Sequence, residues 1–469
     1  MTEAGLRHLP VGLAGFTILL GAQPAFAQDG PNSGDTAWML TSSALVLMMT
    51  VPGLALFYGG LVRAKNILSI LMQCMISAGI VGLLWVLVGY TIAFGGDAAA
   101  PNPFIGGFDK FGLMGVEPTS LLGTIPEYVF VMFQLMFAII TPALMIGAFA
   151  ERMRFGPYLA FISLWLLLVY CPLAHMVWGG GWIGKTLGAK DFAGGLVVHM
   201  SSGFSALVVA IFLGARRGYG REPMPPHSLP LTVIGAALLW VGWFGFNAGS
   251  RLAADGVAGL AFLTTQTAAS TAMVAWVGIE WLHRGRPTAL GAATAAVAGL
   301  VAITPACAYV SPLGAIAIGM GAAGICYVAV TVLKPALGYD DSLDVFGVHG
   351  VGGVWGALAT GLFIAYDATP GVSWGRQVWI QLQSVVFTAT FAPLVTLGLL
   401  LALRAVCGSL RVNDEDEHVG LDLASHSESA YTATASGSIL SSGSHAHAAA
   451  AEGVAALAIS NANAHGGAA

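Results

Sequence analysis

Charge is the scarcest property of this sequence. Only 9% of its 469 residues are Asp, Glu, Lys or Arg, whereas 57% are hydrophobic. A soluble protein of this length needs far more charged surface, so the composition excludes an ordinary soluble domain and predicts an integral membrane protein. The net charge of −5 is small, and it gives no reason to expect a nucleic-acid partner.

Cysteine is also scarce, and its pattern excludes two further classes. The five cysteines lie in or beside apolar segments, at Cys74, Cys171, Cys307, Cys326 and Cys407. They lack the spacing of a metal site or of a disulfide framework, so we expect small buried hydrophobic side chains. Polar and apolar residues also fail to alternate. The apolar runs are unbroken over ~20 residues, which favours membrane-spanning helices over a β-barrel.

The first 27 residues resemble a secretory signal peptide. Arg7 and His8 precede the apolar run "VGLAGFTILLGA", and "AFA" at 25–27 provides a small-x-small cleavage site. These features predict that residues 1–27 are removed and that the mature chain begins near Gln28. A retained additional helix is the alternative.

Residues 28–408 are predicted to form one all-α membrane domain. Eleven apolar spans lie near 36–61, 67–95, 126–150, 156–181, 193–215, 229–250, 257–282, 288–306, 311–333, 345–366 and 377–407. If the mature N-terminus is outside, the inside connections and the C-terminal end carry Arg63, Lys65, Arg152, Arg154, Arg216, Arg217, Arg221, Arg284, Arg286, Lys334, Arg404 and Arg411. The outside connections carry only Lys110, Lys185, Lys190, Arg251 and Arg376. This asymmetry satisfies the positive-inside rule and predicts a cytoplasmic C-terminus.

The C-terminal region divides into two parts. Residues 409–431 are polar and of mixed composition, so they are predicted to form a cytoplasmic segment that can fold against a partner. Residues 432–469 are almost entirely Ala, Ser, Gly and His, and this composition predicts disorder. The histidines there, His445, His447 and His465, are too sparse for a metal site.

Two histidines lie inside apolar spans in similar motifs. "DFAGGLVVHMSSG" (191–203) contains His199, and "DVFGVHGVGG" (344–353) contains His349; both read Val-His-x-x-x-Gly. An aspartate precedes each histidine, Asp191 by eight residues and Asp344 by five. The histidines fall in spans five and ten, so two copies of five helices would be inverted in the membrane. We therefore expect an inverted five-plus-five repeat plus an eleventh helix, with the histidines facing each other.

Several roles are open to such histidines. Each could be an ordinary core histidine bonded to a backbone carbonyl. Ionisable groups inside a membrane usually face a cavity and mark a pathway. A metal site lacks support, because no Cys, Asp or Glu lies one helical turn from either ring. A pair of buried, neutral imidazoles remains, and such a pair offers a small polar molecule both a donor and an acceptor and can relay a proton.

Three further stretches complete a family resemblance: "FVMFQLMFAIITPALMIGAFAERMRF" (130–155), "AHMVWGGG" (174–181) and "GWFGFNAGS" (242–250). On periodicity alone, the phenylalanines read as core residues and Trp178 as an interfacial tryptophan. Together with the histidine motifs, these stretches resemble the ammonium transporter family (Amt/Mep/Rh) in its bacterial branch, from about Asp35 to Tyr431. The resemblance implies a homotrimer with one pore per subunit, no cofactor and no enzymatic activity.

The resemblance also implies roles for individual residues. Phe137, Trp178 and Ser250 correspond to an outer site that recruits the ammonium ion, and Asp191 to an aspartate beside that site that is needed for ion capture. Phe137 and Phe246 correspond to a stacked pair that closes the pore, with Gln134 beside this gate. His199 and His349 correspond to the twin histidines of the pore. Residues 410–431 correspond to a cytoplasmic tail that docks on the inner face and takes part in control by a PII-type protein.

These residue types suit selective ammonium transport. Moving a bare cation into a dry apolar channel costs tens of kcal/mol, whereas a cation–π contact returns only ~2 kcal/mol per ring. Deprotonating an amine with a pKa of ~10.4 at neutral pH costs roughly 4–5 kcal/mol. Ammonia can then cross an apolar pore, and potassium, which has no proton to lose, cannot.

We therefore predict a transporter of ammonium, with methylammonium as a further substrate, in the inner membrane of the cell. The alternatives are an ammonium sensor that signals through a PII-type partner and, in a third class, a membrane enzyme with histidine-bound metal.

Overall fold

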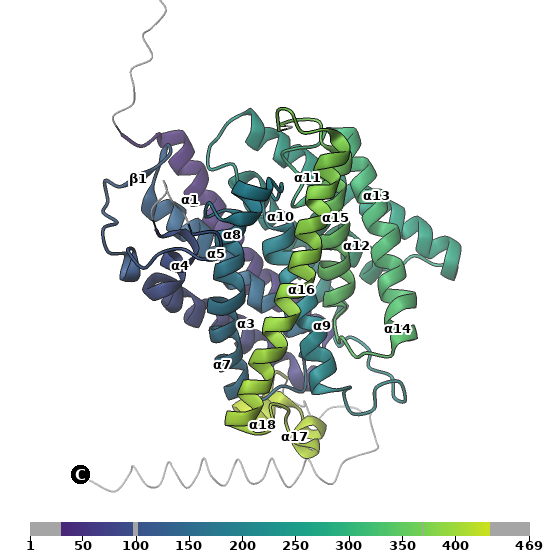
Figure 1. Ribbon diagram of the computed structural model, residues 1–469. Helices are drawn as coiled ribbons and strands as arrows, with labels where there is room; N and C mark the ends of the chain where they lie inside the picture. Colours follow the sequence, from purple (N-terminus) through teal and green to yellow (C-terminus); the bar gives the residue numbers. More distant parts are fainter. Residues whose placement is uncertain (1–29, 97–101, 368, 432–469) are drawn as a thin grey trace, which may run out of the picture.

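The computed structural model describes residues 30–96, 102–367 and 369–431, and it shows a bundle of long helices (Figure 1). The predicted signal peptide and the predicted disordered segment after residue 431 lie outside the described residues. Nothing in the structure therefore tests those two predictions.

The elements follow one another as helices interrupted by short π-helical or 3₁₀-helical turns, which carry the label η. The first half of the chain contains α1 Ser33–Met48, η1 Met49–Leu54, α2 Ala55–Leu61, η2 Ala64–Asn66, α3 Ile67–Leu84, η3 Trp85–Gly89, α4 Tyr90–Phe94, η4 Phe111–Leu113, α5 Glu127–Leu144, α6 Ile146–Phe149, α7 Phe155–Trp165, η5 Leu166–Tyr170, α8 Cys171–Val177, η6 Trp182–Leu187, η7 Gly195–Met200 and α9 Ser201–Leu213. The second half contains α10 Leu229–Gly249, α11 Gly256–Arg284, α12 Ala289–Ile303, α13 Pro312–Val328, η8 Ala329–Leu333, α14 Lys334–Leu337, η9 Phe346–Gly350, α15 Val351–Phe363, α16 Trp374–Cys407, α17 Asp414–Val419 and α18 Leu421–His426. One short antiparallel hairpin joins β1 Leu121–Leu122 to β2 Ile125–Pro126.

The helical segments agree closely with the predicted spans. Ten of them are long and apolar enough to cross a membrane, and α12 is a shorter apolar helix at the place predicted for span eight. Local sequence fixes several of the starting points. Ser228, Ser311 and Ser373 each precede a helix and accept a hydrogen bond from a backbone N–H of its first turn. Pro312 occupies the first position of α13, where no backbone donor is needed.

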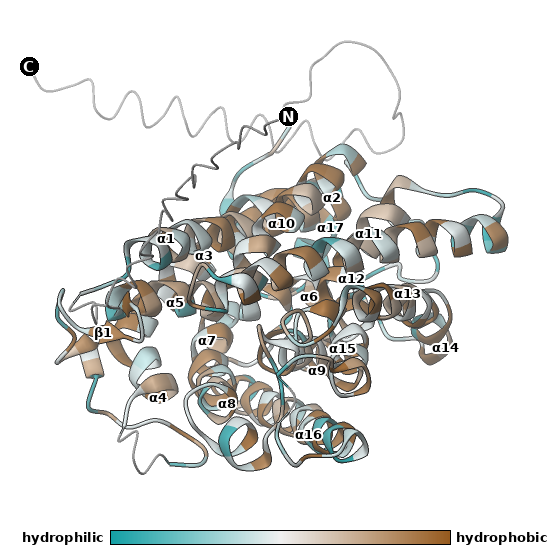
Figure 2. Cartoon of the chain, turned by 90° about the horizontal axis from the view of Figure 1, so that it is seen from above, coloured by the Kyte–Doolittle hydropathy of each residue, from teal (hydrophilic) through white to brown (hydrophobic). Residues whose placement is uncertain are grey.

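The outward-facing surface of the bundle carries many large hydrophobic side chains. Hydrophobic residues cover the peripheral helices, including α13 and α16 (Figure 2). Large apolar side chains point outward there, among them Leu282, Leu313, Leu394 and Val406. Such a surface would aggregate in water but matches the hydrocarbon of a bilayer. The structure is therefore that of a multi-pass integral membrane protein.

Charged residues of the predicted inside and outside connections lie at opposite ends of the bundle. At one end, Arg63 and Arg216 pair with Glu151 and Asp340, and α17 and α18 lie at this end as well (Figure 1). At the opposite end, Lys190 pairs with Asp367 at 2.9 Å. Below, the end that carries α17 and α18 is called the inner face and the opposite end the outer face.

Candidate functional site

The two histidine motifs meet in the middle of the bundle because their glycines let the backbones touch. α9 packs against η9, and α15 packs against η7, so the two copies cross symmetrically. A methyl group added to Gly203 would overlap the backbone of Gly350, and one added to Gly353 would lie 2.9 Å from Met200 Cγ. Each Val-His-x-x-x-Gly motif therefore supplies both a ring and the close approach that brings the rings together.

His199 and His349 face each other as the repeat predicts. Their Nδ1 atoms lie 3.2 Å apart, and the side chains are buried, with relative exposures of 1% and 4%. A hydrogen bond between two Nδ1 atoms needs one donor and one acceptor. Two neutral rings satisfy this condition, whereas two charged rings would both donate and repel each other.

The neighbours of His199 assign the proton positions. Thr304 Oγ1 lies 2.8 Å from Leu300 O, accepts from Trp243 Nε1 at 2.9 Å, and contacts His199 Nε2 at 3.3 Å. The single hydroxyl hydrogen is used on Leu300, so His199 Nε2 donates and its Nδ1 accepts. His349 then donates through Nδ1, which leaves its Nε2 as an acceptor without a proton.

Asp191 begins the segment that carries His199. Its Oδ1 accepts backbone N–H groups of Gly194 and Gly195 at 2.9 and 2.6 Å, and its Oδ2 accepts those of Leu196 and Val197 at 2.8 and 3.3 Å. Its backbone carbonyl accepts Trp178 Nε1 at 2.9 Å. Asp191 thus orients both the histidine segment and the tryptophan, and it does not line the outer cavity described below.

The structural counterpart of Asp191 is Asp341, so pairing Asp191 with Asp344 was wrong. Asp341 Oδ2 accepts Phe346 N–H at 2.7 Å, five residues on, as Asp191 Oδ2 accepts from Leu196. Asp341 precedes His349 by eight residues, the spacing of Asp191 to His199. Burial raises the pKa of Asp341 to about 6, with Asp344 adding to the rise and Lys334 opposing it. The matching spacing in the sequence was the signal that identifies this residue.

The predicted recruitment residues line one cavity at the outer face. This outer cavity has a volume of 320 Å³, and its lining includes Phe137, Trp178, Ser250 and Gln134. The indole of Trp178 stands edge-on to Phe137, with ring centroids 6.0 Å apart. Gln134 is 8% exposed, and its Oε1 has no hydrogen-bond partner among the described residues. The cavity therefore combines aromatic faces with one unsatisfied carbonyl oxygen.

Two phenylalanines separate the outer cavity from the histidines. The rings of Phe137 and Phe246 lie 4.2 Å apart at an interplanar angle of 31°. Beyond them, His199 lies 6.0 Å from Phe246 and 5.5 Å from Trp243, nearly parallel to both. The space at the histidines measures only 10 Å³ and is lined by apolar groups apart from the two imidazoles and the indole N–H of Trp243. It holds no more than about one water-sized molecule.

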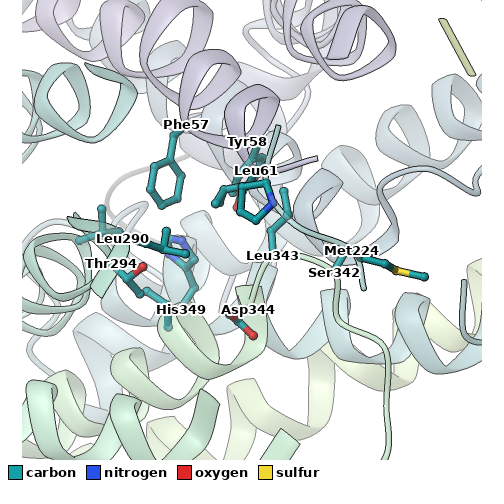
Figure 3. Close-up of a pocket in the computed structure, with 13 residues that line it drawn as sticks. Phe57, Tyr58, Leu61, Met224, Leu290, Thr294, Ser342, Leu343, Asp344 and His349 are labelled. Atoms are coloured by element: carbon teal, nitrogen blue, oxygen red, sulfur yellow. The ribbon is translucent and has the colours of Figure 1, made fainter. Parts of the chain in front are cut away.

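A third cavity continues toward the inner face (Figure 3). This inner cavity has a volume of 140 Å³ and shares Phe57, Val297 and His349 with the space at the histidines. Figure 3 shows Phe57 on one side of it and His349 and Asp344 on the other. The three spaces thus follow one another from the outer face to the inner face, with the phenylalanine pair and the histidines between them.

Comparison with known proteins identifies this arrangement. The chain matches the model of the Ammonium Transporter Family over residues 37–431. It belongs to this family. The resemblance found in the sequence motifs is thereby confirmed.

Relatives of this ammonium transporter family member cover nearly its whole described length. An ammonium transporter of Bacillus subtilis is 48% identical over 406 residues, which are 85% of this chain and 98% of the relative. One from Aquifex aeolicus is 45% identical and covers 90% of this chain and 99% of its own.

Solved structures of the family share the fold. The structure of Candida albicans Mep2 is 37% identical and has a TM-score of 0.76 over 83% of this chain and 88% of its own. A structure titled "Sensor Amt Protein" is 31% identical and has a TM-score of 0.78 over 84% of this chain and 98% of its own.

Of the predicted site residues, the structure places all but Asp191 along the outer cavity and the space at the histidines. Phe137, Trp178, Ser250 and Gln134 share the outer cavity, and Phe246, His199 and His349 follow below it. Sequence reasoning missed Asp341, Thr304 and Trp243. Trp243 lies in the quoted stretch 242–250, whereas nothing in the sequence marks Thr304, whose partners His199 and Trp243 come from other helices. Within the described residues, no group of three or more His, Cys, Asp or Glu side chains could hold a metal ion.

Proposed function

We propose that this chain moves ammonium across the membrane by binding the ion at the outer cavity, removing its proton and passing ammonia along the histidine pair. The observation that carries the proposal is the contact of 3.2 Å between the Nδ1 atoms of His199 and His349 in an otherwise apolar passage. Membership of the family supports ammonium as the substrate.

The outer cavity suits a cation with N–H groups. Phe137 and Trp178 offer aromatic faces, each worth ~2 kcal/mol to a desolvated cation. The Oε1 atom of Gln134 supplies an acceptor that an ammonium hydrogen satisfies. Ser250 donates its hydroxyl hydrogen to Phe246 O at 2.9 Å, so its oxygen lone pairs also remain for the ion. Potassium receives the same electrostatic attraction but gives no hydrogen bond.

The passage below the phenylalanines suits a neutral molecule. Transfer of the bare ion into this apolar space costs tens of kcal/mol before relaxation, whereas deprotonation costs roughly 4–5 kcal/mol. Ammonia both donates and accepts hydrogen bonds. The acceptor at His349 Nε2 and the donor at His199 Nε2 match these two properties. Selectivity against potassium then follows from the proton transfer.

The remaining organisation is proposed from the family resemblance together with the structure. Residues 1–27 are the cleaved signal peptide, 28–408 the membrane domain, 409–431 the regulatory tail and 432–469 a disordered extension. Three copies assemble in the inner membrane with their tails in the cytoplasm. A PII-type protein binds there, at the face where α17 and α18 dock. Methylammonium is a further substrate.

The test is a recording of current and internal pH in liposomes that contain the purified protein. An ammonium gradient should change the internal pH and drive uptake, whereas an equal potassium gradient should produce neither current nor uptake. Equal responses to ammonium and potassium would contradict the proposal.

Ammonium sensing through a PII-type partner is the second candidate. It is favoured by the match to the structure titled "Sensor Amt Protein" and by the ordered tail. The same recordings distinguish it, because a sensor without transport would bind ammonium and leave the liposome pH unchanged.

A further inference from the structure

The inner cavity contains one carboxylate whose role the twin-histidine pathway does not explain. Among the described residues that line the cavity, Asp344 is the only Asp or Glu; the others are apolar groups, a few hydroxyls and His349. The Asp344 backbone is left-handed, with φ of 61°. Asp and Asn tolerate this conformation better than other residues, although it still carries a cost. The chain accepts this conformation where Asp344 lies along the cavity wall near His349 (Figure 3).

The structure already shows what this carboxylate binds. Lys334 Nζ lies 2.6 Å from Asp344 Oδ1, and the two side chains are 17% and 28% exposed. No hydrogen bond from the described residues reaches Asp344 Oδ2. The bound group is a primary ammonium, the same chemical group as an ammonium ion with one hydrogen replaced by a carbon. Lys334 is therefore a tethered analogue of the transported ion.

We infer that Asp344 forms an ammonium-binding subsite at the inner mouth, where Lys334 and the substrate compete for one carboxylate. This inference rests on the proposed function, because it takes ammonium to be the transported substrate. Its ligands are ammonium and small primary alkylammonium ions. Ammonia that reaches the inner cavity regains a proton from cytoplasmic water, and the resulting ion exchanges with the lysine ammonium at Asp344. Release of the ion then restores the ion pair.

The position of Lys334 supports exchange. Lys334 lines a neighbouring groove of 640 Å³ between α11, α12 and η8, and Asp344 lines both this groove and the inner cavity. The lysine can therefore withdraw into the groove while the carboxylate keeps facing the cavity. If a substrate ion binds Asp344 Oδ2 before Lys334 leaves Oδ1, the charge of the carboxylate stays neutralised during the whole exchange.

Competition can be measured without any transport. A water-soluble carbodiimide activates a carboxylate, and a nearby amine then forms an amide while the carboxylate oxygen leaves with the urea by-product. In the purified full-length protein, Lys334 and Asp344 should cross-link. Ammonium chloride should suppress this cross-link and convert Asp344 to its primary amide, as mass spectrometry reports. The Lys190–Asp367 pair, at 2.9 Å on the outer face, is the matched control.

We expect ammonium to suppress the Lys334–Asp344 cross-link at a concentration on the order of tenfold lower than for the control pair. Potassium chloride should leave both cross-links unchanged. The inference is overturned if the two pairs respond alike, if potassium acts as ammonium does, or if Lys334 and Asp344 do not cross-link.

A transport measurement separates this inference from the proposed function. In oriented liposomes, Asp344→Asn should raise the half-saturating ammonium concentration at the inner face by about tenfold, and Lys334→Met should lower it, while outer-face values stay unchanged. Asparagine suits the left-handed backbone, so this variant is expected to fold. Ammonium transport by the wild type with no effect of either variant would overturn the subsite alone. Competition in the cross-linking assay without wild-type transport would overturn the proposed function and leave the subsite standing.

Discussion

At the scale of single residues, the protonation of the two histidines is decided by Thr304, which lines none of the three cavities described above. Thr304 accepts a hydrogen bond from Nε2 of His199, because its own hydroxyl hydrogen is donated to the carbonyl of Leu300. That choice leaves His349 with a free acceptor near the inner cavity. One helix-internal hydrogen bond thus sets the direction of the donor–acceptor chain along the pathway.

Changing the charge of the histidine pair should change selectivity. His199→Glu or His349→Glu should admit potassium, because a carboxylate offsets the cost of placing a cation in the passage. His199→Ala and His349→Ala should lower ammonium uptake by at least about tenfold, since the donor and acceptor are lost. Uptake of ammonium and potassium into liposomes provides the measurement.

His283→Gln is the control for these variants, because His283 lies at the end of α11 and bonds to Tyr327 instead. Full and selective uptake by both alanine variants would show that the histidines have no role in transport.

Trp178 provides a second prediction at this scale. Trp178→Leu keeps an apolar side chain but removes the aromatic face over the outer cavity. The loss of 1–2 kcal/mol should raise the half-saturating ammonium concentration by about 5- to 30-fold and leave thermal stability nearly unchanged. Trp379→Leu is the matched control, because Trp379 lies on α16 and is half exposed. Equal effects of the two substitutions would argue against ion binding at Trp178.

At the scale of elements, two buried aspartates start the two half-copies of the repeat. Asp191 satisfies four backbone N–H groups before η7. Asp341 is completely buried before η9, and its Oδ1 atom has no partner among the described residues. The two copies of the repeat therefore share a backbone arrangement, but they differ in how many hydrogen bonds their aspartates accept. Burial raises the pKa of both carboxyl groups, and at Asp191 the four backbone N–H groups oppose this rise.

The raised pKa of Asp341, about 6 through burial, predicts a pH-dependent stability. The folded state favours the protonated carboxyl, so this contribution is fully present below the unfolded pKa of ~3.9 and is lost as pH rises through about 6. The loss amounts to about 3 kcal/mol for a shift of this size. Asp341→Asn, which stays neutral, should become more stable than the wild type by about this amount above pH 6 and equal to it near pH 4.

Denaturation of the detergent-solubilised protein across this pH range measures the difference. Asp367→Asn, at an exposed site, should leave the pH profile unchanged. A constant offset between the wild type and Asp341→Asn at all pH values would contradict the prediction.

At the scale of the whole molecule, the tail joins two inner connections into one unit. Glu417 accepts Arg217 N–H at 2.6 Å and pairs with Arg411, and Lys65 donates to the carbonyl of Glu417. Asp422 accepts Ser69 N–H at 2.8 Å at the start of α3. The side chain of Glu417 is buried although it is charged, so its partners must remain in place. The docked tail therefore reports on the relative positions of these membrane helices.

Glu417→Ala should release the tail, because it leaves Arg411 and the Arg217 backbone N–H without their acceptor. The expected loss of about 3 kcal/mol from docking should raise the rate of proteolytic cleavage near residue 412 more than tenfold while the membrane domain stays intact. Glu415→Ala is the control, because Glu415 lies two residues from Glu417 in the same helix and is exposed. Gel analysis of limited digests gives the measurement, and equal cleavage of the two variants would contradict the tail contacts.

The sequence alone determined the membrane class, the positions of the helices, the histidine repeat and the separation of charged connections, because each depends on local composition or on spacing along the chain. The outer and pore residues were predicted from motifs through the family resemblance, and their roles remain predictions. Only the tertiary structure decided that Thr304 orients His199 and that Lys334 pairs with Asp344, whereas the eight-residue spacing already marked Asp341 as the counterpart of Asp191. The contact of Thr304 with His199 joins segments 105 residues apart, and the Lys334–Asp344 pair depends on the turn between α14 and η9, so neither follows from the pattern of a single helix.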